Sequence, residues 1–276
     1  MSLFFRHFTS SAQRMAIVGM VHVRALPATP NGTLSVQQLV DKACEETQLY
    51  CQHGLDGICI ENMFDIPYVK GDDAGPETTA VMTRVASEVR KIAPISVPCG
   101  VQILAAQNKQ AMAVALAADL QFIRAEGFVF GHVADEGLME ACAGPLLRYR
   151  KLIDANQVAI LTDIKKKHCS HSITADTDIV DTAKATQFFL SDGLIITGKE
   201  TGDSPDLEEV TRVRRQLPNM PIIVGSGVTK ENVDKFAQCG VNAAVVGSYF
   251  KKQGQWQNEL CPDRLAQFMD RFRSCY

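Results

Sequence analysis

The segment best equipped for chemistry in this chain begins with an apolar run at residues 158–161. Asp163 closes that run, and a partly buried carboxylate at the end of a strand suits a general acid or base. Three lysines come next, and Lys165 and Lys167 would point to the same side if the strand continued past them. Either lysine could bind an anion or form a Schiff base. A structural salt bridge at Asp163 and a solvated run of charges at the lysines are the alternatives.

Other apolar runs also end in polar residues. Glu61 follows the run at residues 58–60 and is a second candidate for acid–base chemistry. Ionisable groups that converge on one rim are costly unless they pair or bind something, so their convergence predicts a functional site. The remaining polar residues expected at this rim are His22, Asn62, Arg124 and Thr197.

Histidines near these run ends raise a metal-binding alternative. His168, which is also a catalytic candidate, and His171 could ligate zinc or another divalent cation together with His22, Glu61 or Asp163. The chain has no H-E-x-x-H motif, and its first apolar run carries no H-x-H. We therefore predict no cofactor and no protein-bound metal, and we keep a divalent metal as the alternative.

A glycine turn closes the apolar run at residues 222–224. Gly225, Ser226 and Gly227 form this turn, and Thr229 is expected to open a helix. A helix N-terminus presents unpaired N–H groups and the positive end of its dipole, and glycine lets an anion come close. The segment therefore predicts a phosphate site.

The same pattern recurs where Gly247 and Ser248 follow the run at residues 243–246. Two consecutive strand ends with glycine turns match the phosphate site that many (β/α)₈ barrels build after their last two strands. Glycines that only shape the two turns are the alternative interpretation.

Eight apolar runs, each followed by a helical pattern, would position these residues. The predicted strands are 16–21, 58–60, 97–104, 122–124, 158–161, 193–196, 222–224 and 243–246. Continuous apolar strands that alternate with helices indicate a parallel sheet covered by helices. Eight such units fit a single α/β domain, a closed (β/α)₈ TIM barrel, with its chemistry at the C-terminal ends of the strands. A doubly wound open sheet is disfavoured, because no G-x-G-x-x-G follows the first strand.

One connection in this pattern is unusually rich in polar residues. His132, Asp135 and Glu136 precede a segment, 138–154, that is predicted to be mainly helical. These residues are interpreted either as a lid over the rim or as a plain helix start.

The composition limits the class of protein. Hydrophobic residues make up 46% of the 276 residues and charged residues 21%, as in an ordinary globular protein. A net charge of −3 argues against a nucleic-acid-binding surface, and no apolar run is long enough to span a bilayer. The nine cysteines include no C-x-x-C pair, which favours a reducing compartment over a disulfide framework.

The first fifteen residues differ from the rest of the chain. They contain Arg6, His7 and Arg14, several hydroxyl side chains and no acid. This composition is typical of a mitochondrial transit peptide, which would place the protein in the matrix. A disordered tail of 1–15 on a cytoplasmic protein is the alternative. The barrel domain is expected to run from 16 to 276.

Several motifs together resemble the BtpA family. They are GMVHVRALPATP at 19–30, GLDGICIEN at 54–62, PETTAVMTRV at 76–85, LLRYRK at 146–151, ILTDIKKKH at 160–168 and IVGSGVTKENV at 223–233. The resemblance implies a barrel fold. Cyanobacterial members are linked to the accumulation of photosystem I at the thylakoid surface, and some bacterial relatives that accompany sugar-uptake systems are presumed enzymes.

The chain also departs from the pattern of that family. The third-strand motif, usually closer to GVNVLRND, reads GVQILAAQN at 100–108. AEGFVFGHVADEG, at 125–137, replaces an asparagine-valine-histidine run, and Lys165 stands where the family has a histidine. A rim that differs in this way is expected to bind a different substrate.

Three functions follow from these residues. The first is an enzyme that acts on a phosphorylated small molecule, such as a sugar phosphate or nucleotide derivative, by proton transfer, isomerisation or lyase chemistry. The second is a non-enzymatic factor that assembles or stabilises a protein complex, and the third is a metal-dependent hydrolase. The rim residues favour the first, and a homo-oligomer is left open.

Overall fold

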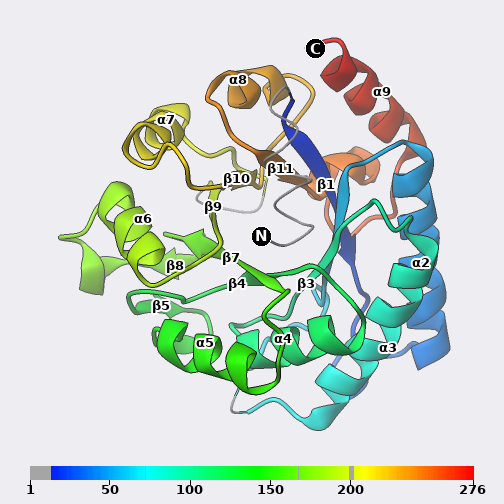
Figure 1. Cartoon of the computed structure of the whole chain (residues 1–276). Helices are drawn as coiled ribbons and strands as arrows, with labels where there is room; N and C mark the ends of the chain where they lie inside the picture. The colour runs from blue at the N-terminus through cyan, green and yellow to red at the C-terminus, as the bar shows by residue number, and fades with distance from the viewer. Residues whose placement is uncertain (1–13, 72, 167, 199–201) are drawn as a thin grey trace.

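The computed structural model describes residues 14–71, 73–166, 168–198 and 202–276. Eight parallel strands close into a barrel in the order β1-β11-β10-β9-β7-β4-β3-β2, and helices surround it (Figure 1). The predicted TIM barrel is therefore confirmed. The strands are β1 (Ala16–His22), β2 (Gly57–Glu61), β3 (Cys99–Gln102), β4 (Phe122–Ala125), β7 (Ala159–Ile164), β9 (Gly193–Thr197), β10 (Ile222–Gly225) and β11 (Ala243–Val246).

The strands are apolar for most of their length, up to their C-terminal ends, because both of their faces are covered. All seven residues of β1 are buried, and β1 closes the barrel by pairing with β11 and β2. Side chains such as Met20, Phe122 and Leu161 fill the barrel interior. Gly100 in β3 makes room for the Phe122 ring, since a Cβ there would lie 2.2 Å from it.

Helices cover the outside of the barrel and lead the chain back to the next strand. They are α2 (Val36–Gln52), α3 (Pro76–Ile92), α4 (Asn108–Ala117), α5 (Ala143–Leu152), α6 (Ile179–Phe188), α7 (Leu207–Gln216), α8 (Val233–Gln238) and α9 (Pro262–Arg273). Ser35 caps α2, because its side chain accepts a hydrogen bond from the Gln38 amide and the Gln38 side chain accepts one from the Ser35 amide. Pro76 occupies the first turn of α3, where its missing N–H costs nothing.

The prediction of a helix over residues 138–154 is wrong at its N-terminal end. Strands β5 (His132–Ala134) and β6 (Gly137–Met139) form a hairpin there, and β8 (Cys169–Ser170) pairs with the other edge of β5. Gly137 adopts a φ of 94°, which suits glycine and interrupts a helix. The polar segment before α5 is thus the turn of an antiparallel sheet beside the barrel rim.

The N-terminal boundary of the folded domain lies earlier than expected. Met15 is only 3% exposed, and its backbone N–H donates to the Tyr276 hydroxyl at 2.9 Å. Arg14 pairs with the Asp56 carboxylate and lies over the Phe272 ring. The predicted transit peptide falls largely on residues 1–13, outside the described residues. None of the helices in the described part of the chain is long and apolar enough to cross a membrane.

Candidate functional site

A pocket of about 510 Å³ opens at the C-terminal ends of the barrel strands. Most of the predicted rim residues line it, although they come from distant parts of the sequence. The predicted residues in its wall are His22, Glu61, Arg124, Asp163, His168, Thr197, Ser226, Gly227, Gly247 and Ser248. Asn62, Lys165 and Gly225 are not part of this wall, and Lys167 lies outside the described residues.

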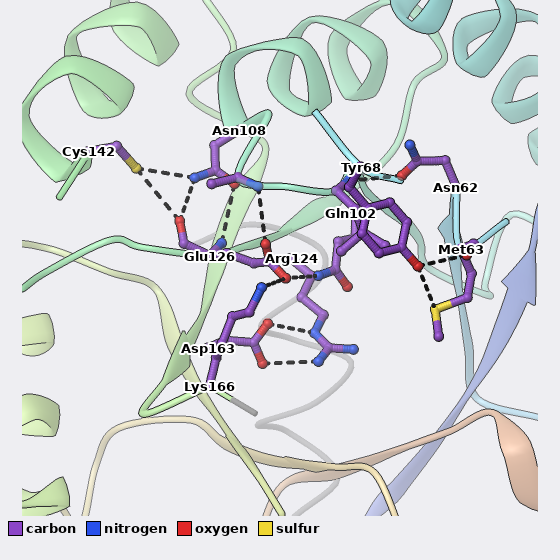
Figure 2. A network of polar contacts seen from close by, with 12 residues as sticks. Asn62, Met63, Tyr68, Gln102, Asn108, Arg124, Glu126, Cys142, Asp163 and Lys166 are labelled. Carbon is purple, nitrogen blue, oxygen red and sulfur yellow. Dashed lines mark hydrogen bonds and ion pairs between the residues drawn. The ribbon is translucent and has the colours of Figure 1, made fainter. Parts of the chain in front are cut away.

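Arg124 and Asp163 form a buried ion pair on the floor of the pocket (Figure 2). They stand on the neighbouring strands β4 and β7, and the guanidinium donates two hydrogen bonds to the carboxylate at 2.9 and 3.0 Å. Burial alone would lower the pKa of Arg124, but the carboxylates of Asp163 and Glu61 hold that pKa above its usual value. Arg124 is therefore a fixed cation, held by both oxygens of Asp163.

Glu126 and Lys166 form a second buried pair beside the first, with 2.9 Å between the carboxylate and the ammonium (Figure 2). The Gln102 side chain and the Ala106 amide also donate to this carboxylate, at 3.0 and 3.1 Å. Burial would raise the pKa of Glu126, yet Lys166, the hydrogen bond from the Ala106 amide and the charge of Arg124 keep it below its usual value. Burial alone would lower the pKa of Lys166, but the negative charge of Glu126 raises it. The pKa of Lys166 therefore lies above its usual value. Both groups are charged at neutral pH.

The sequence prediction missed Lys166 because the strand does not continue through the lysines. Strand β7 ends at Ile164, and Lys165 has a φ of 46°. Lys165 therefore turns away from the large pocket and donates to the Thr174 carbonyl at 3.1 Å. Lys166, rather than Lys165, reaches the rim. The predicted alternation assumed a strand that continues through the lysines, whereas β7 ends at Ile164, and Lys167 lies outside the described residues.

His22 and Glu61 end two other neighbouring strands, β1 and β2, and stand opposite each other in their register. Their side chains are buried, and His22 Nε2 lies 3.6 Å from a Glu61 carboxylate oxygen. Trp256 packs edge-to-face against the His22 ring, with 6.5 Å between the ring centroids. This histidine and this carboxylate face the pocket together, at a separation longer than a hydrogen bond, and each is a group that can exchange a proton with a ligand.

Asn62 does not line the pocket but holds two neighbouring loops together. Its side-chain amide donates to Asp65 at 2.8 Å, and its side-chain oxygen accepts from the Leu104 amide at 2.9 Å. Burial raises the pKa of Asp65, although hydrogen bonds from Leu26 and Asn62 oppose this shift. Asn62 thus joins the loops that follow β2 and β3.

The turn after β10 is formed by the predicted residues, but no helix begins at Thr229. Ser226 and Gly227 both have positive φ, 70° and 58°. The Thr229 amide donates to the Asn232 side chain at 2.8 Å, and α8 starts only at Val233. The predicted contribution of a helix dipole at Thr229 is therefore absent. The backbone amides of the turn are what remains to bind an anion.

The turn after β11 lies next to it, since β10 and β11 are paired. Gly247 leads into a 3-10 helix, η2 (Ser248–Phe250). Lys251, directly after η2, forms a buried ion pair with Glu46 of α2. This pair links the turn to the helices that surround the barrel. Among the described residues, the backbone amides of Gly227, Val228, Ser248 and Tyr249 have no hydrogen-bond acceptor. Four donors thus remain for a ligand at these two turns.

The predicted histidines do not gather into a metal site. His168 lies at the exposed margin of the pocket, whereas His171 Nε2 lies 2.9 Å from the Lys166 carbonyl, behind the pocket wall. In the ranges that the structure describes, no group of three or more His, Cys, Asp or Glu residues is placed to hold a metal ion. Asp135 and Glu136, at the tip of the β5–β6 hairpin, reach the pocket margin.

Comparisons with known proteins agree with this architecture. A model of the BtpA family matches residues 13–274. A Caenorhabditis elegans protein described as uncharacterized and mitochondrial is 43% identical over 262 residues, 94% of this chain and 93% of the relative. The photosystem I biogenesis protein BtpA of Synechocystis sp. is 29% identical over 259 residues, 92% of this chain and 86% of that protein.

Solved structures give the same fold at low sequence identity. The (S)-3-O-geranylgeranylglyceryl phosphate synthase of Thermoplasma acidophilum, solved with its substrate sn-glycerol-1-phosphate, superposes with a TM-score of 0.63. The two sequences are 12% identical, and the alignment covers 99% of each chain.

Proposed function

The chain belongs to the BtpA family, and from that premise we propose that it is an enzyme that uses acid–base chemistry on a phosphorylated small molecule. The observation that carries the proposal is the shared pocket. Two adjacent turns with unpaired backbone amides and three buried acid–base or ion pairs line the same 510 Å³ cavity. Amides of this kind bind phosphate without a counter-charge from a side chain.

In this proposal the phosphate group lies against the turns after β10 and β11. Thr197 stands beside them at the end of β9, and its buried hydroxyl has no partner among the described residues. That hydroxyl can donate a further hydrogen bond to a phosphate oxygen. The Thermoplasma acidophilum synthase named above, a barrel of the same fold, was solved with a glycerol phosphate, so this fold can bind a ligand of this kind.

The reacting part of the ligand then faces the three pairs. Lys166 and Arg124 are cations held in the pocket wall by their carboxylate partners, where they stabilise negative charge that develops in a transition state. Glu61, next to His22, is the proposed proton-transfer group. Asp163, the first acid–base candidate from the sequence, has both oxygens engaged by Arg124 and serves by holding that guanidinium in place.

Binding at the turns can be tested with a charge placed where the phosphate would lie. Ser248→Asp puts a carboxylate at this position, and Ser248→Asn is the matched control with the same shape and no charge. A ligand that binds only the folded protein raises its melting temperature. We expect at least one of inorganic phosphate, glycerol 3-phosphate, ribose 5-phosphate and AMP to raise the melting temperature of the native protein and the Asn variant, but not of the Asp variant.

Turnover of the ligand found in this way tests the catalytic assignment. Glu61→Gln should bind the ligand with little change but lose its conversion, followed by mass spectrometry. Full activity in this variant would remove Glu61 from the mechanism. A folded native protein that responds to no phosphorylated compound would overturn the proposed function.

One observation favours a second candidate function, an assembly factor for a protein complex. Phe188 at the end of α6 is 81% exposed, and Leu190 and Leu152 are 68% and 80% exposed. These side chains lie at helix ends that face away from the rim, where a partner could cover them. The Synechocystis relative is named for photosystem I biogenesis.

The C. elegans relative supports a mitochondrial location for this chain, which we place in the matrix.

A further inference from the structure

The side of the pocket that adjoins the phosphate turns across β1 is built differently. Met63, Tyr68, Leu104 and Trp256 line it, around the ends of β1, β2 and β3. Strand β1 pairs with β11, so this apolar wall begins next to the Gly247 turn. A ligand that consisted of a phosphate and a small polar group would leave this surface uncovered.

Trp256 is held in place by its own loop. Lys251 and Leu260 form a bridge that closes the loop at its base, and the Lys252 amide donates to the Glu259 carbonyl at 2.9 Å. The Asn258 side chain donates across the loop to the Lys252 carbonyl at 2.9 Å. The indole is therefore presented to the pocket by a braced loop, so little ordering is needed when a ligand packs on it.

Phe64 supports the indole from outside the pocket wall. Its ring centroid lies 4.9 Å from that of Trp256 in an edge-to-face arrangement, and the Arg24 guanidinium covers the Phe64 ring at 4.3 Å. His22 and Phe64 both meet the indole edge-to-face, so the three rings form an aromatic cluster at this side of the pocket. Flat aromatic surfaces of this kind are well suited to stack on a flat ring.

Gln102, at the end of β3, places a polar side chain on the same side of the pocket. Its side chain is 1% exposed, and its amide nitrogen donates to the Glu126 carboxylate (Figure 2). The carboxylate fixes this orientation, because the opposite one would set two acceptors against each other. Gln102 belongs to the pocket wall, and its side-chain oxygen is buried without a hydrogen-bond donor among the described residues. A buried acceptor without a donor is costly, so a ligand donor that reached this oxygen would stabilise the complex.

We propose that the phosphorylated ligand carries a flat aromatic or heteroaromatic ring, which packs on Trp256 and presents an N–H or O–H donor to Gln102. This inference rests on the proposed function for the phosphate end of the ligand and adds the class of its other end. A nucleotide or another ring-bearing phosphate ester meets both requirements. The volume of 510 Å³ lies in the range of pockets that enclose ligands of this size.

Trp256 makes the inference directly measurable, because it is the one tryptophan in the chain. AMP, UMP and pyridoxine 5′-phosphate would be compared with ribose 5-phosphate and with adenosine, by calorimetry for each ligand and by tryptophan fluorescence for those that do not absorb at the excitation wavelength. We expect at least one ring-bearing phosphate to bind roughly tenfold or more tightly than ribose 5-phosphate, in line with a stacked base. A non-absorbing ligand that stacks on the indole should also change its emission.

Trp256→Leu keeps an apolar side chain and removes the flat ring. This variant should bind ribose 5-phosphate as the native protein does and lose the preference for the ring-bearing ligand. Equal affinity for ribose 5-phosphate and every ring-bearing phosphate would overturn the inference and leave the proposed function standing, as would a preference that survives in Trp256→Leu. Adenosine that binds as tightly as AMP would instead count against the phosphate site, and binding of none of these compounds would overturn both.

Discussion

The loss of the Glu126–Lys166 pair should destabilise the fold strongly, because the Glu126 carboxylate is buried and the Lys166 side chain is mostly buried. Lys166→Met leaves the Glu126 carboxylate buried without its counter-charge and should lower the free energy of unfolding by about 3–5 kcal/mol. The matched double variant, Glu126→Gln with Lys166→Met, removes both charges and should recover most of this loss. Urea unfolding at neutral pH measures both values. A single variant as stable as the native protein would show that the pair is not formed.

The same pair sets the limits of the pH range in which it stabilises the fold. The pKa of Glu126 is lowered in the folded state, so its contribution is present above the unfolded value of about 4.3 and is lost as the pH falls through the folded value. The pKa of Lys166 is raised, so its contribution is present below about 10.4 and is lost as the pH rises through the folded value. The stability difference between native protein and double variant should therefore fall at both ends of the pH range.

Part of this residue pattern is readable from the sequence. Arg124 and Asp163 each close an apolar run, so their meeting at the rim follows once the barrel is recognised. Glu126 could have been found as well, because it is two residues after Arg124 and side chains alternate along a strand. Lys166 could not, because the positive φ of Lys165 turns the chain after β7 and depends on tertiary contacts such as that with Thr174.

At the scale of an element, the turn after β10 depends on one glycine. A Cβ on Gly227 would lie 2.2 Å from backbone atoms of Asp203 and Ser204, in addition to the strain of its φ of 58°. Gly202 is the matched control, because its φ is 95° and a Cβ there meets nothing within 4 Å. Gly202→Ala should cost only about 1–2 kcal/mol of backbone strain. Gly227→Ala should cost more and weaken binding of any phosphorylated ligand.

Thermal unfolding with and without that ligand checks this difference between the two turn positions. Equal losses in the two alanine variants would mean that the backbone of residues 203 and 204 can move away without cost. Both glycines have positive φ, but only Gly227 is crowded by neighbouring atoms. The difference between the two variants therefore gives the cost of steric crowding apart from the cost of backbone strain.

Elements were predictable where the sequence shows either a continuous apolar run or a clear helical period. The buried strands and helices such as α2 and α7 meet this condition. The β5–β6 hairpin does not, because its strands have three residues each and its pairing with β8 is set by a segment some thirty residues later. Leu138 and Met139 therefore looked like the start of α5, and only the fold assigns them to a sheet.

At the scale of the whole molecule, Arg14 and Met15 belong to the predicted targeting segment, 1–15, and also make contacts in the folded barrel. Deletion of residues 1–13 should leave the urea midpoint unchanged, because the barrel keeps both residues. Deletion of 1–15 removes the buried Met15 side chain and the Arg14–Asp56 pair, and it should cost about 1.5–3 kcal/mol for the methionine alone.

If residues 1–13 direct import, the mature protein should retain both of these contacts. The N-terminus of the chain recovered from mitochondria, read by mass spectrometry, is therefore expected at or before Arg14. A fusion of residues 1–13 to a fluorescent protein should enter the matrix, and the same fusion with Arg6→Glu should not, because import signals depend on positive charge. A mature chain that begins after Met15 would contradict the boundary, and cytoplasmic fluorescence of the unmutated fusion would contradict the signal.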